Sequence, residues 1–197
     1  MSLIFSGSLV LAQEFPSQAW HKGKLVTNEG DTVKGLIKYD QETDIVQIQQ
    51  GTKTKTFTAR KFSYFEILDQ LSGYYRYFYT IPFQSGPGYR VPQLFELLQE
   101  GNLTLLSREY IVTENLPQYN SYYQSSFSRQ RLNYTFYILE ESKDLYRYNG
   151  KRNDLLEIMD DYESEIKKYI RKNRLRTDEK RDIVRIVAYY NALEQDS

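Results

Sequence analysis

The chain has 197 residues, with 26 basic and 26 acidic side chains, one His, no Cys and 19 Tyr. This length fits one domain and is sufficient to bury a core without metal ions or disulfides. Zero net charge argues against a protein whose main role is to neutralise nucleic-acid phosphates. The absence of Cys excludes disulfides, thiolate nucleophiles and Cys-based zinc sites, and a single His excludes multi-His metal sites. The sequence therefore predicts no metal, no cofactor and no nucleic-acid partner.

Residues 1–12 look like the remnant of a secretory signal peptide. Residues 3–12 carry no charge, and Val10 and Ala12 fit a small-residue cleavage site that leaves Gln13 as the mature N-terminus. The stretch is shorter than the ~20 residues that span a bilayer as a helix. It departs from a complete signal peptide in one respect, because no basic residue precedes it. The alternative is an apolar N-terminal strand. We favour the signal and expect an exported protein, periplasmic or surface-associated, with no transmembrane segment.

Residues 13–150 are predicted to form a β-rich domain, because apolar residues recur with period two between turn residues. The segment Leu94–Glu100 also fits a short helix, but the Gly101-Asn102 link to the next run favours a hairpin. We expect an antiparallel β-meander of about ten strands, as a sheet, sandwich or open barrel. The predicted strands are Trp20–Thr27, Thr32–Lys38, Ile45–Gln49, Lys55–Thr58, Phe62–Asp69, Tyr74–Ile81, Leu94–Glu100, Leu103–Val112, Leu132–Leu139 and Leu145–Tyr148.

A long polar and aromatic connection, residues 114–131, interrupts this pattern. Loops longer than about 12–15 residues are uncommon in compact domains and are usually functional or disordered. Its aromatic residues stand among Ser and Gln, a composition typical of recognition loops. The candidate ligand-binding residues are Tyr119, Tyr122, Tyr123 and Phe127.

Residues 151–197 are predicted to form three amphipathic helices, so the fold class is α+β. Asn153 and Thr177 are candidate N-caps of the first and third helices. We expect the helices to pack on the β domain, with a separate small bundle as the alternative.

A basic run covers residues 167–176 and could face nucleic acid, anionic lipid or an acidic partner. A solvated helix face is the favoured interpretation, because Glu163 can pair with Lys167 one turn later. The residues of this basic helix patch are Lys167, Lys168, Arg171, Lys172 and Arg174.

Other candidates for chemistry are weaker. His21 is expected on the surface or on an edge strand, and no nucleophile elbow or phosphate-binding loop occurs. The tyrosines at 74, 75, 77 and 79 are interpreted as ordinary strand residues. Glycoside hydrolysis needs only two carboxylates, but the β region offers no distinctive acidic pair. The sequence thus points to no catalytic residue.

Three segments carry a resemblance to a family: Gly23–Ile37, Phe95–Gly101 with Arg108–Tyr110, and Asp182–Leu193. Together they resemble uncharacterised exported proteins of Bacteroidetes-type bacteria, a family with no established activity. The shared motifs are hairpin turns and helix faces. The resemblance implies export and a single structural unit.

These observations favour a non-enzymatic envelope protein that binds an unknown protein or glycan partner through its β domain. The alternative is a carbohydrate-active enzyme that uses an Asp/Glu pair. The sequence does not indicate the oligomeric state.

Overall fold

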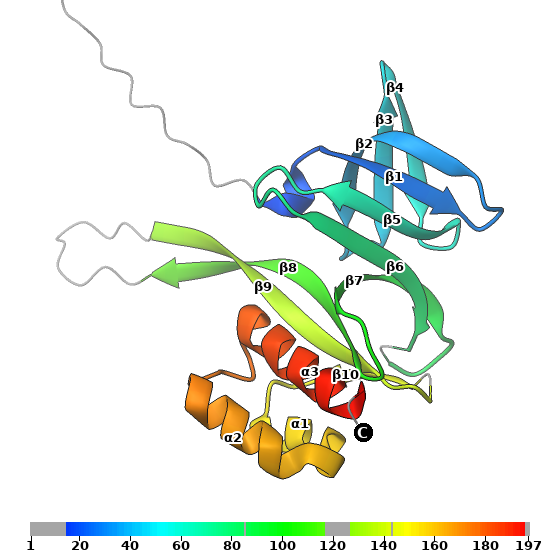
Figure 1. Ribbon diagram of the computed structural model, residues 1–197. Coiled ribbons are helices and arrows are strands. Elements are labelled where there is room, and N and C mark those ends of the chain that lie inside the picture. Colours follow the sequence, from blue (N-terminus) through cyan, green and yellow to red (C-terminus); the bar gives the residue numbers. More distant parts are fainter. Residues whose placement is uncertain (1–14, 85, 117–126, 143, 196–197) are drawn as a thin grey trace, which may run out of the picture.

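The computed structural model describes residues 15–84, 86–116, 127–142 and 144–195 (Figure 1). The strands are β1 (His21–Thr27), β2 (Thr32–Asp40), β3 (Ile45–Gln50), β4 (Lys53–Thr58), β5 (Phe62–Leu68), β6 (Tyr75–Phe83), β7 (Val91–Gln99), β8 (Thr104–Leu116), β9 (Phe127–Leu139) and β10 (Leu145–Tyr148). The helices are α1 (Arg152–Ile158), α2 (Glu163–Asn173) and α3 (Lys180–Gln195), with short 3-10 turns η1 (Pro16–Gln18) and η2 (Asp160–Tyr162).

The ten strands form one open antiparallel sheet in the order β10-β9-β8-β7-β6-β5-β1-β2-β3-β4. The predicted ten-stranded antiparallel sheet followed by helices is therefore confirmed. The order is not a single meander, however, because β5 pairs with β1 instead of β4. Two meanders, β1–β4 and β5–β10, are joined through this pair, which places β1 inside the sheet.

The half of the sheet from β1 to β7 curls around its own apolar core (Figure 1). That core contains fully buried Ile37, Phe65 and Phe78. Gly23 and Gly35 face each other across β1 and β2. A Cβ at Gly23 would lie 2.2 Å from the carbonyl oxygen of Glu66, so the missing side chain permits a close approach of neighbouring strands.

The sheet opens where β7 and β8 diverge, and the β2–β3 turn fills the opening. β7 pairs with β8 only from Glu96 to Gln99, opposite Leu105–Ser107. Beyond this point the Asp44 carboxylate accepts the backbone N–H of Leu94, at 2.7 Å. The Gln41 side chain accepts the backbone N–H of Glu109 at 2.8 Å and donates to the carbonyl of Leu94 at 3.0 Å. Side chains of the turn thus satisfy backbone groups that lose their strand partners.

The helices lie below β8 and β9 and cover one face of this part of the sheet (Figure 1). Leu105, Phe136 and Ile138 of the sheet share a core with Ile166 and Ile186 of the helices. Asn191, near the end of α3, hydrogen-bonds to the backbone of the β7–β8 turn. The Asn191 amide accepts the N–H of Leu103 at 3.0 Å and donates to its carbonyl at 2.9 Å.

Several sequence-based boundaries differ from the structure. The expected connection 114–131 is shorter, because β8 continues to Leu116 and β9 begins at Phe127. The N-cap of α1 is Lys151, without a side-chain cap, so the prediction for Asn153 is wrong. Thr177 precedes α3 by three residues and donates to the carbonyl of Gly150 at 2.9 Å, so it fastens a loop instead of capping the helix. Polar residues before a helix compete for several backbone partners, and the tertiary contact decides among them.

Candidate functional site

A buried cluster of charges lies where the curled half of the sheet meets β8. We call it the ion network; it comprises Asp69, Arg76, Glu96, Glu109 and Lys180. The Arg76 guanidinium donates from Nε to Glu96 at 2.7 Å and from Nη2 to Glu109 at 2.8 Å. It also lies 3.4 Å from Asp69. The side chains of Arg76, Glu96 and Glu109 are at most 9% exposed, so these contacts are shielded from water.

Tyr39 completes the network across the curl of the sheet. Its hydroxyl accepts a hydrogen bond from Arg76 at 2.8 Å and donates one to Glu109 at 2.6 Å. Tyr39 belongs to β2 and Glu109 to β8, two strands that are far apart in the sheet order. Burial raises the pKa of Tyr39 well above its ordinary value, and Glu109 reinforces this, so the hydroxyl remains a donor at neutral pH.

Helix α3 is tied to the same network through Lys180. Its ammonium lies 2.9 Å from Glu96 and 4.5 Å from the centre of the Tyr134 ring. Burial alone would raise the pKa of Glu96, but Arg76 and Lys180 outweigh it and lower the pKa. Burial alone would lower the pKa of Arg76, but Glu96, Tyr39 and Glu109 raise it. Both groups are therefore ionised at neutral pH.

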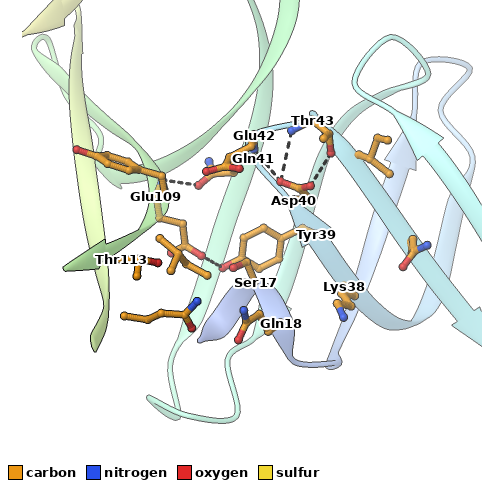
Figure 2. A pocket seen from close by; sticks show the side chains of 15 residues that line it. Ser17, Gln18, Lys38, Tyr39, Asp40, Gln41, Glu42, Thr43, Glu109 and Thr113 are labelled. Carbon is orange, nitrogen blue, oxygen red and sulfur yellow. Dashed lines mark hydrogen bonds between the residues drawn. The ribbon is translucent and has the colours of Figure 1, made fainter. Parts of the chain in front are cut away.

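A polar groove of about 690 Å³ lies directly beside this network (Figure 2). One side is formed by η1 and the end of the β2–β3 hairpin, and the other by β8 and β9. Tyr39 and Glu109 line it from the ion network. Its volume is within the range of ordinary ligand sites, about 300–1,000 Å³.

Two cross-strand pairs line the groove: Lys38 opposite Gln47, and Thr113 opposite Gln130. Within the described part of the chain, none of these four side chains hydrogen-bonds to another residue. The Asp40 carboxylate, in contrast, accepts bonds from the backbone of Glu42 at 2.8 Å and from the Thr43 hydroxyl at 2.7 Å. Asp40 thus holds its own turn, while the two pairs offer free donors and acceptors.

Most of the sequence-predicted aromatic site lies outside the described residues. Tyr119, Tyr122 and Tyr123 lie outside the described residues, and Phe127 is placed only as the first residue of β9. The segment that carries them connects the two strands that form one side of the groove. Neither the signal-like residues 1–12 nor this segment is tested by the structure.

The basic helix patch lies on α2 and at its end. Lys167 pairs with Glu163 at 2.5 Å, as the i, i+4 spacing predicts. Lys168, Arg171 and Lys172 are exposed, and Arg174 ends the helix in the left-handed conformation at φ 53°. This patch is separate from the groove, and no described residue links the two.

The prediction for His21 is wrong. His21 is fully buried, because β1 lies between β5 and β2 instead of at an edge. Its Nε2 lies 2.7 Å from the carbonyl oxygen of Pro16, and its Nδ1 accepts the backbone N–H of Gln70 at 3.2 Å. In this arrangement Nε2 donates to Pro16 and Nδ1 accepts from Gln70, so the ring connects η1 to the β5–β6 turn.

The sequence-based interpretation missed Arg76, Glu96 and Glu109, which form the ion network. One local pattern does point to Glu96. In the run Leu94-Phe-Glu-Leu-Leu98, alternation along the strand places Glu96 on the same face as the apolar residues Leu94 and Leu98. A charged residue at an inward strand position requires a partner of opposite charge. The partner itself is 20 residues away, and no local pattern identifies it.

Among the described residues, no group of three His, Asp or Glu side chains could hold a metal ion. The same residues contain no helix long and apolar enough to cross a membrane. No family model matches the sequence, and no curated protein or solved structure was found to be similar to it.

The lowered pKa of Glu96 predicts an acid-sensitive fold. In the unfolded chain the pKa of Glu is about 4.3. Because the folded pKa is lower, the stabilisation is complete above the unfolded value and is lost as the pH falls through the folded one. We expect the free energy of unfolding, measured with urea, to fall as the pH decreases below the unfolded value of about 4.3, and Glu96→Gln to flatten this slope.

Glu114→Gln is the matched control for this experiment, because Glu114 pairs with Arg131 on the surface with a side chain 38% exposed. It is expected to leave the slope as in wild type. An unchanged slope in Glu96→Gln would show that other carboxylates govern the acid transition.

Proposed function

We propose that this protein is a non-enzymatic, exported protein of the cell envelope that binds a neutral glycan in the polar groove. The supporting observation is the placement of two cross-strand pairs, Lys38–Gln47 and Thr113–Gln130, on the lining of the groove. None of their side chains hydrogen-bonds to a described residue. Glutamine amides donate and accept hydrogen bonds at adjacent atoms, which matches neighbouring sugar hydroxyls. Export rests on the sequence of residues 1–12 alone.

The ion network supports a binding role by holding the lining of the groove in place. A ligand site is effective when its polar groups are preorganised by packing and hydrogen bonds. Tyr39 and Glu109 are fixed by Arg76, and the β2–β3 turn is fixed by Gln41 and Asp44. These bonds join the two sides of the groove.

The carboxylates at the groove favour binding over hydrolysis. A glycosidase acid has a raised pKa and is free to donate to the leaving oxygen. Glu109 accepts bonds from Tyr39 and Arg76, and Asp40 is bonded to its own turn. Of the acids that line the groove, this leaves only Glu42 without a hydrogen bond from a described residue.

The proposal is tested by calorimetric titration of the protein with soluble oligosaccharides of glucose and of N-acetylglucosamine. We expect Gln47→Ala and Gln130→Ala each to weaken binding about 2- to 10-fold, the effect of one hydrogen bond. Gln49→Ala is the matched control, because Gln49 lies on the same strand but bonds to the carbonyl of Gly51 at 3.3 Å.

Absence of binding by the wild-type protein, or equal losses in all three variants, would contradict the proposal. Release of shorter sugars during prolonged incubation would favour the alternative, a carbohydrate-active enzyme. Glu42→Gln would then be expected to abolish the release.

A further inference from the structure

A second surface with the chemistry of a ligand site lies on the face of the sheet opposite to the helices. Its tyrosines are Tyr75, Tyr77 and Tyr79 on β6 and Tyr64 on β5, and we call it the tyrosine face. The three tyrosines of β6 are 61%, 39% and 37% exposed, whereas Phe78 between them is fully buried. They are strand residues, as predicted, but their rings face outward.

The helices do not cover this surface. The cross-strand register places Tyr77, Leu97, Leu106 and Tyr137 in one row, on one face of the sheet. The helices pack against Leu105, Phe136 and Ile138, which alternate with that row and so lie on the opposite face. Within the described part of the chain, the three β6 rings therefore remain open to solvent.

The tyrosines are arranged as a row of rings. Alternate residues of a strand repeat every 6.6–6.8 Å or so, which spaces Tyr75, Tyr77 and Tyr79 along β6. Tyr64 lies opposite Tyr79, and their rings stack with centres 5.7 Å apart and planes 27° from parallel. This pair keeps one end of the row in a fixed orientation.

An ion pair lies among the rings and indicates the kind of ligand. Glu66 is directly opposite Tyr77, and its carboxylate lies 3.1 Å from the ammonium of Lys24. Charged residues are depleted at the centre of protein–protein interfaces. These tyrosine hydroxyls have no hydrogen-bond partner among the described residues, and rings with such hydroxyls beside a charged pair match a ligand with alternating apolar and hydroxyl surfaces.

We propose that the tyrosine face binds a flat, β-1,4-linked polysaccharide by ring stacking. When such a chain is built of glucose or N-acetylglucosamine, the ring substituents are equatorial, so both faces of each ring present C–H groups that can lie on a tyrosine. The sugar edges then meet tyrosine hydroxyls and the Lys24–Glu66 pair. The proposal does not depend on the polar groove, which lies at the β2–β3 turn and for which a separate ligand is proposed.

The test is co-sedimentation of the protein with insoluble cellulose, chitin and peptidoglycan sacculi. We expect the wild-type protein to pellet with at least one of them, and Tyr75→Ala and Tyr77→Ala each to weaken binding about 2- to 10-fold. Tyr77→Phe should retain most of the binding, because the ring is kept. Tyr89→Ala is the matched control, since Tyr89 is 92% exposed and lies outside the row.

Three outcomes would overturn the proposal. The wild-type protein could fail to pellet with any of the three polymers, or Tyr89→Ala could weaken binding as much as Tyr77→Ala. Light scattering could instead show a dimer that Tyr77→Ala dissociates, which would assign the face to a second copy of the chain. Loss of pelleting only in Gln47→Ala and Gln130→Ala would transfer the binding to the groove and leave the tyrosine face without a role.

Discussion

Replacement of Arg76 by methionine is expected to lower the free energy of unfolding by about 3–5 kcal/mol, the usual effect of removing one partner from a buried ion pair. The guanidinium contacts Glu96, Glu109 and Asp69, and the side chains of these three acids are at most 5% exposed. Without it, Glu109 has no cationic partner among the described residues, and Glu96 has only Lys180. The measurement is urea unfolding followed by circular dichroism.

Arg131→Met is the matched control, because Arg131 is 57% exposed and pairs with Glu114 at 3.3 Å. A surface pair of this kind contributes about 0–1 kcal/mol. Should Arg76→Met not fold, the triple variant with Glu96→Gln and Glu109→Gln is expected to regain stability, since it removes the unpaired charges. Equal losses in Arg76→Met and Arg131→Met would contradict a stabilising role for the ion network.

Replacement of Gly23 by alanine is expected to cost at least the roughly 1–3 kcal/mol of an overpacked core site. The new Cβ would lie 2.2 Å from the backbone oxygen of Glu66. It would also lie 3.0 Å from Cδ1 of Ile37 and 3.1 Å from Cγ2 of Ile67, which is closer than most side-chain contacts. The strands would have to separate, since a backbone carbonyl cannot rotate away. For a protein of this size, each kcal/mol corresponds to about 2–4 °C in Tm.

Gly86→Ala is the control for this prediction, because a Cβ there would meet no atom within 4 Å. Gly35→Ala is expected to behave like Gly23→Ala, since its Cβ would lie 2.4 Å from the carbonyl oxygen of Gln49. If Gly23→Ala had the same free energy of unfolding as the wild-type protein, the curl of β1 and β2 would not need the glycine pair.

Much of the fold could be predicted because its signals are local. Alternating apolar residues and turn residues locate strands such as β2 and β6, and the spacing of Ile183, Ile186 and Val187 locates α3. Strand ends are less well determined. The polar residues 114–115 and 128–131 form strand because β8 and β9 pair with each other, and this pairing overrides their weak preference.

The candidate site was much less predictable. Arg76, Glu96 and Glu109 come from three strands, and their contact depends on how far the sheet curls. The groove depends on the docking of the β2–β3 turn between β7 and β8. Both are consequences of contacts between residues that are distant in sequence, for which a single sequence carries no pattern.

By itself the sequence determined the class of chain: a β-rich protein with C-terminal helices, no cysteine, one histidine and balanced charge. Only the tertiary structure decided that β1 joins β5, which buries His21 and places strand tyrosines on an open face. The physical reason is that composition and periodicity depend on residues near each other in the chain. Strand order, burial of charge and exposure of rings depend instead on which strands meet in space.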